Sequence, residues 1–298
     1  MLRSGSSDLR KRKGIVFGGL NMTGQSIFLP GVSNARELGG YKAGGKRIKN
    51  GVLIRSSVLG KASPEALDTL QKQYRVQAVI DLRSGMESSS LPDPAIEGAK
   101  NIHLPPFEME DMLTGIDPAL VEQFSDPKMD RMAFFQAAYE GGILSDRLYE
   151  QFLLTDYSKR AWKAFFQVLL MLEDDRAVLW HCTDGKDRTG CAAMLILFAL
   201  GADWDTVMQD YLLTNEYNAD KLYAVWKKTA ALNWPRDKVN GLLFMSGGVF
   251  AGYMANAIGA LIEGYGSVEA YLGQELGVGI TEIEELRRKF LISLDMDS

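Results

Sequence analysis

One cysteine and one arginine, separated by five residues, have types and spacing that suit phosphate chemistry. Cys182 and Arg188 lie within residues 181–190, whose sequence is HCTDGKDRTG. A thiolate is a strong nucleophile, and a guanidinium can hold two oxygens of a tetrahedral oxyanion in one planar fork. A cysteine below such an oxyanion can attack phosphorus while the arginine holds the transferred group. The spacing alone also occurs by chance in many proteins, so the pair predicts hydrolysis of a phosphate ester through a phosphocysteine intermediate only together with the residues around it.

The other residues of this segment suit a cradle for a phosphate group. An apolar run, residues 177–180, precedes it as a predicted strand, and residues 189–200 follow it as a predicted apolar helix. A loop that turns from a strand into a helix N-terminus points backbone N–H groups at an anion, and glycines let the backbone approach closely. A helix N-terminus and neighbouring cations also favour a thiolate over a thiol. The predicted phosphate-binding residues are Thr183, Asp184, Gly185, Lys186, Thr189 and Gly190.

Hydrolysis also needs a group that gives a proton to the leaving oxygen and later takes one from water. Asp187, next to the arginine, is the first candidate, and Asp184 is the second. Asp81 ends a predicted strand, and strand ends line the crevice where α/β proteins bind ligands. We therefore expect Asp81 either to act as the acid or to orient a loop residue. His181 is predicted to support the loop through backbone contacts, and Thr189 to hydrogen-bond the departing sulfur.

The chain has two cysteines, Cys182 and Cys191, and two histidines, His103 and His181. Two cysteines do not make a disulfide framework, and a free nucleophilic thiol suits a reducing compartment. Two histidines exclude a His-rich metal site, and the Cys/His spacing fits no common zinc pattern. We therefore predict no metal and no cofactor. Cys191 is predicted to pack in the core, the alternative being a reversible disulfide that protects Cys182.

Strands and helices alternate before the loop, in an order typical of an α/β sheet. The predicted strands are residues 51–55, 76–82, 101–104 and 177–180. Residues 63–73 and 158–172 have helical periodicity, and the last third of the chain is predicted to be helical. Its final helix is predicted to begin at Thr281, because Glu284 follows at capping-box spacing.

No linker rich in proline, glycine or serine divides the chain after about residue 45, and residues 26–298 are predicted to form a single phosphatase domain. Residues 1–25 are polar and glycine-rich, and are predicted to form a mobile or loosely docked N-terminal arm. Residues 105–150 interleave aromatic and methionine side chains with acidic residues. They are predicted to form either a pair of core-packing helices or a helical lid over the active site.

The net charge of −5 and the pI of about 5.3 argue against a nucleic-acid partner. An anionic substrate must therefore be attracted by a local positive site. The longest apolar run, residues 191–200, is too short to span a bilayer, and residues 14–20 are too short and glycine-broken for a signal peptide. We expect a soluble cytoplasmic protein without an integral membrane segment, although a secreted chain with its signal peptide removed would have the same sequence features.

Residues 181–190 resemble the active-site loop of bacterial tyrosine phosphatases of the atypical, lipid-phosphatase-like type, which reads His-Cys-x-x-Gly-Lys-Asp-Arg-Thr-Gly. The resemblance covers roughly residues 28–292. Residues 34–40, NARELGG, are similar to the Asn-Phe-Arg-Asp-Leu-Gly-Gly signature of that family. The further matching segments are Arg55-Ser56, Asp81-Leu82-Arg83, residues 210–215 and residues 265–272.

The resemblance implies a central, mostly parallel sheet flanked by helices, as in protein tyrosine phosphatases, with a helical insertion and a helical last third. It also implies metal-independent hydrolysis of phosphotyrosine, sometimes of phosphoserine or phosphothreonine, and of phosphoinositides. Several members have a helical lid, in agreement with the second interpretation of residues 105–150. By position, the implied roles are nucleophile for Cys182, phosphate binder for Arg188, extra loop cation for Lys186, acid and base for Asp187, and supporting carboxylate for Asp81.

Two departures from the family pattern affect these roles. Ala35 and Glu37 replace the usual Phe and Asp of the first signature, which changes packing near the loop and leaves its chemistry intact. Asp184 replaces a residue that is often alanine, so the loop is also similar to that of myotubularin lipid phosphatases. The loop then has two carboxylates, Asp184 and Asp187, that compete for the role of general acid.

The substrate and two other functional classes stay open. Lys186 beside Arg188 could bind a second phosphate, which favours a phosphoinositide over a phosphorylated protein, or could serve only to stabilise the thiolate. A binding module without catalysis would usually have lost Cys182, Arg188 or Asp187. A sulfur transferase or arsenate reductase would lack the run Gly-Lys-Asp-Arg-Thr-Gly. The sequence makes no prediction of the oligomeric state.

Overall fold

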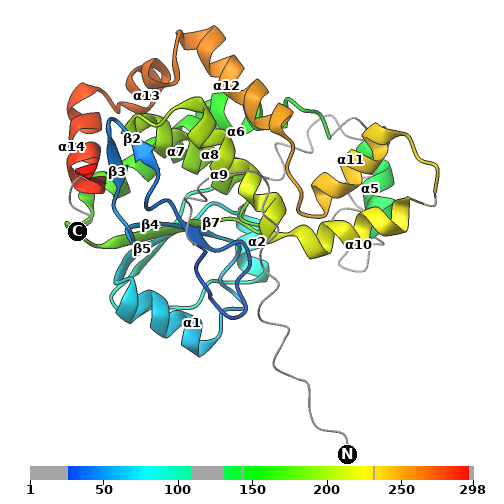
Figure 1. Cartoon of the computed structure of the whole chain (residues 1–298), viewed down its shortest axis with the longest axis horizontal. Helices are drawn as coiled ribbons and strands as arrows, with labels where there is room; N and C mark the ends of the chain where they lie inside the picture. Colours follow the sequence, from blue (N-terminus) through cyan, green and yellow to red (C-terminus); the bar gives the residue numbers. More distant parts are fainter. Residues whose placement is uncertain (1–25, 109–130, 142–143, 231, 295–298) are drawn as a thin grey trace, which may run out of the picture.

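The computed structural model describes residues 26–108, 131–141, 144–230 and 232–294 (Figure 1). Its main sheet has five strands in the order β1-β4-β7-β5-β6. Their bounds are β1 Arg36–Glu37, β4 Leu53–Ser56, β5 Val76–Asp81, β6 Lys100–His103 and β7 Ala177–His181. The pairs that join β4, β7, β5 and β6 are parallel, and β1 is antiparallel to β4. The predicted mostly parallel sheet is therefore confirmed.

A second, smaller sheet joins the two ends of the described chain. It has the order β2-β3-β8, with antiparallel pairs throughout. The bounds are β2 Lys42–Ala43, β3 Lys46–Ile48 and β8 Leu291–Ile292. The last third of the chain is thus helical, as predicted, except for this short strand after the final helix.

The helices pack either on the main sheet or on one another. The short ones are α1 Pro64–Asp68, the π-helical turn η1 Thr69–Gln73, α2 Gly85–Ser90, α5 Arg131–Glu140 and α6 Leu148–Leu154. The central ones are α7 Asp156–Met171, α8 Asp187–Leu200 and α9 Trp204–Tyr217. The C-terminal ones are α10 Ala219–Thr229, α11 Arg236–Met245, α12 Ala251–Tyr265, α13 Val268–Leu276 and α14 Ile280–Phe290.

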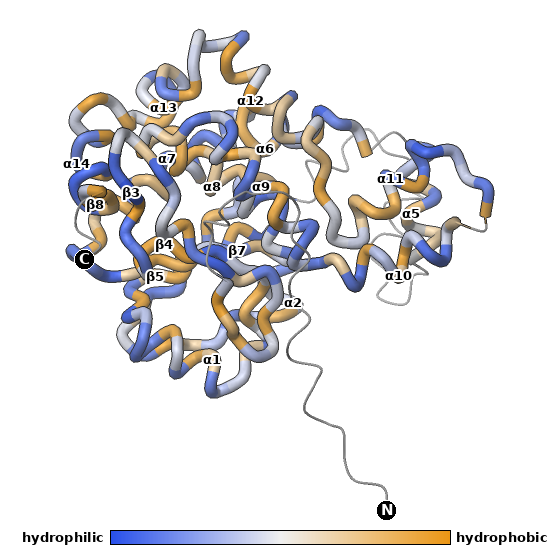
Figure 2. The backbone as a smooth tube through the Cα atoms, in the orientation of Figure 1, coloured by the Kyte–Doolittle hydropathy of each residue, from blue (hydrophilic) through white to orange (hydrophobic). Residues whose placement is uncertain are grey.

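Alternate residues of β7 pack on opposite faces of the sheet, because side chains of a strand alternate in direction. Ala177 and Leu179 belong to the cluster that includes Ala66 of α1, whereas Val178 and Trp180 belong to the larger cluster formed with α7 and α8. All of β7 is buried, since it has a strand on each side and helices on both faces. Figure 2 shows the hydrophobic residues concentrated along these central strands.

The strand register brings three strand ends to one edge of the sheet. His181 at the end of β7 lies opposite Ser56 at the end of β4 and Asp81 at the end of β5. The carboxyl edge of a parallel sheet is where α/β folds place their ligand crevices. The predicted loop leaves β7 at this edge and enters α8, which begins at Asp187, two residues earlier than predicted.

The remaining predictions on organisation concern segments that the structure describes only in part. Residues 105–150 include α5 and the beginning of α6, while residues 109–130 and 142–143, and the predicted arm 1–25, lie outside the described residues. Figure 1 shows α5 beside α11 and α10, in a helical arm to one side of the main sheet. Among the described helices, none is long and apolar enough to cross a membrane.

Candidate active site

The loop between β7 and α8 buries both residues on which the predicted chemistry depends. Cys182 is 1% exposed and Arg188 is 8% exposed. The backbone turns into α8 through Gly185, whose φ of +68° favours glycine. No described side chain caps the N-terminus of α8, so its first N–H groups stay available for an anion. A strand-to-helix turn of this kind can bind an anion, and Cys182 stands at its beginning.

Side chains from the N-terminal part of the chain hold this loop from behind. The Asn34 amide donates to the carbonyls of Asp184 at 3.2 Å and Gly185 at 2.8 Å. Arg55 at the end of β4 donates to the same Gly185 carbonyl at 2.9 Å. These bonds fix the peptide carbonyls outward, which leaves the loop N–H groups pointing toward the opposite side.

A buried ion triad in turn holds those side chains. Asp210 on α9 accepts from Arg36 Nε at 3.0 Å and from Arg55 Nη1, and Arg36 also donates to Asn34 Oδ1. Burial would raise the pKa of Asp210, but Arg55 and Arg36 hold it below its usual range. The segments around residues 34–40, 55 and 210 were noted only as family matches; the structure shows that they converge on the loop.

The close packing of Gly185 gives a first testable prediction. A Cβ on Gly185 would lie 2.4 Å from the Ser56 carbonyl oxygen, at a positive φ. Gly185→Ala is therefore expected to displace the loop and lower the kcat/KM of the predicted reaction by roughly 10²-fold, since misplacement of about 1 Å has that effect. Gly45→Ala is the matched control, because Gly45 has a φ of +73° with nothing within 4 Å of its Cβ position. Equal activity of the two variants would contradict the role of the close contact.

Arg188 is held by a carboxylate that the sequence analysis did not single out. Glu87 on α2 accepts from Arg188 Nη1 at 2.6 Å and Nη2 at 2.9 Å, and the Leu82 carbonyl accepts a further bond from Nη1 at 3.2 Å. These described contacts use three of the five guanidinium N–H groups. Two N–H groups remain, which is the number needed to hold two phosphate oxygens.

Glu87 is itself fixed by the start of α2 and by the loop. It accepts from the Ser84 backbone N–H at 2.9 Å and hydroxyl at 3.0 Å in a capping box, and from the Thr183 hydroxyl. Burial would raise the pKa of Glu87, but its bonds and charge interaction with Arg188 lower it to about 2. The spacing Ser84-x-x-Glu87 just after a strand was the available sequence signal.

Asp187, the first candidate acid, lies at the start of α8 with its side chain 22% exposed. Its carboxylate accepts from the buried hydroxyl of Tyr149, which lies 2.9 Å from the hydroxyl of Tyr211. Burial, and then the charge of Asp187, raise the pKa of Tyr149 well above its usual range, so this phenol stays a donor. Asp184, the second candidate, is half-buried, and its carbonyl is used by Asn34.

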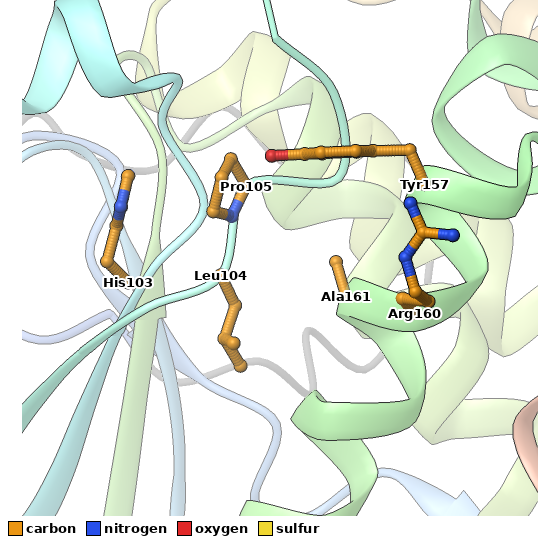
Figure 3. Close-up of a pocket in the computed structure, with 6 residues that line it drawn as sticks. All are labelled: His103, Leu104, Pro105, Tyr157, Arg160 and Ala161. Carbon is orange, nitrogen blue, oxygen red and sulfur yellow. The ribbon is translucent and has the colours of Figure 1, made fainter.

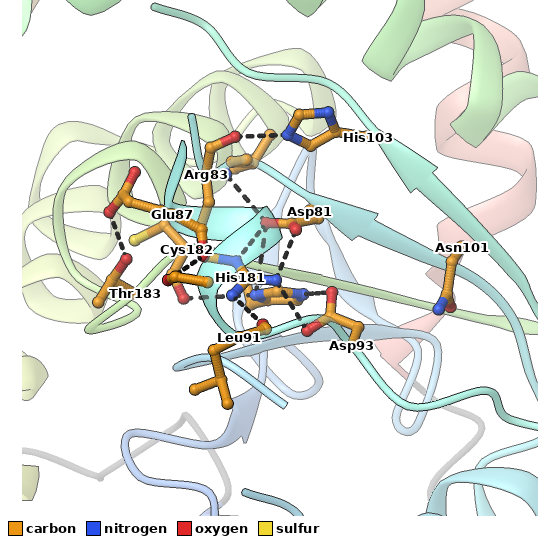
Figure 4. A network of polar contacts seen from close by, with 12 residues as sticks. Asp81, Arg83, Glu87, Leu91, Asp93, Asn101, His103, His181, Cys182 and Thr183 are labelled. Atoms are coloured by element: carbon orange, nitrogen blue, oxygen red, sulfur yellow. Dashed lines mark hydrogen bonds and ion pairs between the residues drawn. The ribbon is translucent and has the colours of Figure 1, made fainter. Parts of the chain in front are cut away.

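Asp81 belongs to a network behind the loop (Figure 4). Its carboxylate accepts three bonds from Arg83, from the backbone N at 2.9 Å, Nε at 2.8 Å and Nη2 at 2.7 Å. His181 lies with Nδ1 3.9 Å from Asp81 and with Nε2 2.7 Å from Asp93. Burial would raise the pKa of Asp81, but Arg83 and His181 lower it. This placement favours the orienting role of Asp81 over the acid role.

Among the described residues, the two aspartates and the histidine of this network form a group that could ligate a metal ion. Asp81, Asp93 and His181 offer ligand atoms within 4.8 Å of one another. However, the Arg83 guanidinium donates to Asp81 and also to Asp93, at 3.1 Å. A fixed positive charge thus occupies the position that a cation would take, so the residues fit a charge network better than a metal site.

Lys186 points away from the strand-to-helix turn toward the helical arm. Its ammonium group donates to the Phe244 carbonyl and, at 3.3 Å, to the Gly248 carbonyl, and it lies 3.8 Å from the centre of the Phe244 ring. It is also 3.7 Å from the Asp187 carboxylate. The side chain is only 4% exposed. These contacts do not leave Lys186 directed at a second phosphate.

The first turns of α8 contain the last predicted loop residues. The buried Oγ1 of Thr189 makes no hydrogen bond with any described residue. The Thr189 carbonyl accepts a hydrogen bond from the Trp180 indole at 3.1 Å. Gly190 lets α8 approach Tyr211 of α9, since a Cβ would lie 3.3 Å from that ring. Cys191 is buried, which raises the pKa of its thiol well above the usual range and agrees with the predicted core position.

A shallow hollow lies near the site without including any loop residue (Figure 3). It has a volume of about 240 Å³ and is lined by His103, Leu104, Pro105, Tyr157, Arg160 and Ala161. His103 Nε2 lies 2.7 Å from the Arg83 carbonyl, which links this hollow to the network behind the loop. Tyr157 donates to Glu108, and Glu108 accepts from the backbone N of Gly85 at the start of α2.

Known proteins match nearly the whole chain. A family model described as "Tyrosine phosphatase family" matches residues 27–292. A protein of Cupriavidus necator named as a tyrosine-protein phosphatase is 32% identical over 256 residues, covering 85% of this chain and 84% of that protein. The triple specificity protein phosphatase PtpB of Mycobacterium tuberculosis is 26% identical over 282 residues, covering 87% and 96%. A crystal structure of PTPMT1 in complex with PI(5)P has a TM-score of 0.27 and 13% identity over 70% of this chain and 96% of that one, too little to bear on function.

Proposed function

Because this chain belongs to the tyrosine phosphatase family, we propose that it hydrolyses phosphomonoesters through a phosphocysteine intermediate on Cys182. The observation that carries the proposal is the fork of Arg188, which Glu87 holds from one side with two N–H groups left for phosphate oxygens. The uncapped N-terminus of α8 supplies backbone donors for the remaining oxygens. Cys182 directly follows β7, at the start of the same loop.

In the first step, the Cys182 thiolate attacks phosphorus, the P–S bond forms and the P–O bond to the leaving group breaks. Asp187 gives its proton to the leaving oxygen, because it lies at the loop with part of its carboxyl exposed. In the second step, water attacks phosphorus and loses a proton to Asp187. The P–S bond then breaks, inorganic phosphate leaves, and the thiolate is restored.

The surrounding residues position these groups without taking part in proton transfer. Arg188 and the loop N–H groups stabilise charge on the phosphate oxygens in both steps. Thr189 is assigned to the sulfur, because its Oγ1 has no other partner among the described residues. His181, with Asp93 and Asp81, holds the end of β7 from which the loop departs.

For the substrate class, we propose phosphotyrosine, with phosphoserine, phosphothreonine and phosphoinositides as further substrates. The name of the mycobacterial relative, a triple specificity phosphatase, supports a broad range for this chain. The proposal is tested by hydrolysis of para-nitrophenyl phosphate in the presence of EDTA, by the wild type and by Cys182→Ser. Vanadate, a phosphate analogue, should inhibit the wild type, which separates it from cysteine enzymes of other reaction classes.

The contacts of Lys186 predict how it acts on two kinds of substrate. Because its ammonium group joins the loop to the Phe244 and Gly248 carbonyls, Lys186→Met is expected to lower kcat/KM on a phosphotyrosine peptide and on an inositol lipid by the same factor, about tenfold. The measurement is the ratio of the two losses. If kcat/KM fell only for the inositol lipid, Lys186 would be binding a second phosphate of that substrate. That result would favour phosphoinositides as substrates.

A further inference from the structure

The carboxylate of Asp187, the residue proposed as acid and base, is held by only one of its two oxygens. Among the described residues, Oδ1 accepts a hydrogen bond from the Tyr149 hydroxyl, whereas Oδ2 accepts none. Oδ2 lies 3.7 Å from the ammonium group of Lys186, which donates instead to the carbonyls of Phe244 and Gly248. Oδ2 is therefore the oxygen left to exchange a proton with substrate or water.

The hydrogen bonds that lead to Asp187 have a fixed direction. A phenol has one O–H group to donate, and Tyr149 uses its own on Asp187, because an ionised carboxylate only accepts. The 2.9 Å contact between the two phenol oxygens must therefore be donated by Tyr211 and accepted by Tyr149. Burial raises the pKa of both phenols well above the usual range, so each keeps its proton. The result is a chain of two hydrogen bonds that ends on Asp187 Oδ1.

Packing holds both phenols in place. Tyr149 on α6 and Tyr211 on α9 are buried, and their rings meet edge to face with centroids 6.1 Å apart. The rings of Phe152 and Tyr253 also pack on Tyr149, each with its centroid 5.7 Å away. Helices α6 and α9 both pack on α8, which begins at Asp187 (Figure 1). The Tyr149 hydroxyl is therefore a fixed point that holds the carboxylate at the start of α8.

A hydrogen bond to one carboxylate oxygen fixes the plane of the group and favours its ionised form. Among the described residues, no side chain holds the carboxylate of Asp184 in this way, although its carbonyl accepts from Asn34. Tyr149 alone donates a hydrogen bond to Asp187 among the described titratable or charged groups around it. These groups are Lys186, Arg188 and Cys191 of the loop and α8, Tyr149 of α6, Tyr211 of α9 and Tyr253 of α12.

We infer that Tyr149 is a positioning residue, which holds Asp187 so that Oδ2 carries the transferred proton, and that Tyr211 keeps Tyr149 directed at Oδ1. In the first step, the proton on Oδ2 passes to the leaving oxygen. In the second step, Oδ2 takes a proton from the attacking water, while both phenols keep theirs. The proton transfer rests on the proposed phosphatase function, whereas the effect of Tyr149 on the Asp187 carboxylate does not.

The pH dependence of kcat/KM on a phosphotyrosine peptide separates this role from a merely structural one. Asp187 must be protonated in the first step, so kcat/KM falls on the alkaline side as Asp187 ionises. Tyr149→Phe removes a bond that favours the ionised form, so the alkaline limb is expected to move upward by about one pH unit or more. The maximum of kcat/KM is expected to fall about tenfold, because the carboxylate is no longer held in one direction. Tyr211→Phe should move the limb the same way by less, since the bond from Tyr149 stays.

The matched control is Tyr271→Phe, which also removes a buried hydroxyl. Tyr271 donates to the Leu153 carbonyl at 2.6 Å rather than to Asp187. It should lower the melting temperature about as much as Tyr149→Phe does and leave the alkaline limb in place. A double-mutant cycle adds a second criterion. In the Asp187→Asn background, Tyr149→Phe should cause no further loss of kcat/KM, because it acts through that carboxylate.

An alkaline limb that Tyr149→Phe leaves in place, or losses that add in the double mutant, would show that Tyr149 serves only the fold. A limb that Asp184→Asn removes and Asp187→Asn keeps would give the acid role to Asp184. The titration of the Asp187 carboxyl by carbon NMR, assigned with Asp187→Asn, makes the same comparison without turnover. If the wild type hydrolyses nothing, the proposed function fails. A titration midpoint higher in Tyr149→Phe than in the wild type would then still support the action of Tyr149 on Asp187, and an equal midpoint would overturn it.

Discussion

Cys182→Ser is expected to abolish hydrolysis of para-nitrophenyl phosphate, lowering kcat by about 10⁴-fold or more, as removal of a catalytic nucleophile does in other enzymes. A serine hydroxyl is not ionised at neutral pH, and the helix N-terminus and neighbouring cations that favour a thiolate do not ionise it. The side chain is 1% exposed and the two residues have nearly the same shape. The variant should therefore keep the fold and the phosphate cradle while it loses the chemistry.

The control for this variant is the second cysteine. Cys191→Ala changes a buried thiol of α8 that the proposed reaction does not use, and burial keeps that thiol protonated by raising its pKa. It should retain activity in the same assay with EDTA present. Activity retained by Cys182→Ser would exclude the phosphocysteine route. No activity in correctly folded wild type would favour a phospho-ligand binding module, to be tested by titration with phosphoinositides and phosphopeptides.

The sheet could be predicted because parallel strands buried on both faces are continuous apolar runs in the sequence. The segment 177–180 is one of these, and the helix after it is apolar for the same reason. Caps were harder to predict. Thr281 and Glu284 have capping-box spacing, but α14 begins at Ile280, with Gly279 as its N-cap and Glu282 accepting from the Gly279 N–H at 2.9 Å. The N-cap therefore lies two residues before the predicted one, at the same three-residue spacing from its glutamate. The prediction missed it because glycine has no side chain that marks a cap.

The loop could be predicted because its residues are contiguous, whereas its supports are far apart in the chain. Glu87 is 101 residues from Arg188, and Asp210 is 155 residues from Arg55. No local pattern encodes such pairs, since they depend on how β5, β7 and α9 come together. Lys186 is close to Arg188 in sequence but donates to the carbonyls of Phe244 and Gly248. Neighbouring residues at a helix start diverge in direction, so its adjacency to Arg188 in sequence did not place both side chains on one phosphate.

Arg188→Lys is expected to lower kcat/KM by roughly 10³-fold, the lower range for loss of an arginine that stabilises a transferred phosphoryl group. Lysine keeps the charge but offers one ammonium group in place of the planar fork. It cannot bond both oxygens of Glu87 and two phosphate oxygens at once. The loss should appear also as weaker inhibition by vanadate, because the same fork holds the ground-state anion.

The matched control is Arg83→Lys. Arg83 is also buried and also paired with carboxylates, Asp81 and Asp93, but it lies behind the loop and does not face the phosphate. Both substitutions disturb a buried ion pair, so both should lower the melting temperature by similar amounts. Only Arg188→Lys should weaken vanadate binding strongly. If the two variants lost activity and vanadate affinity equally, the guanidinium of Arg188 would be serving the fold of the loop rather than the phosphate, and the proposed cradle would be wrong.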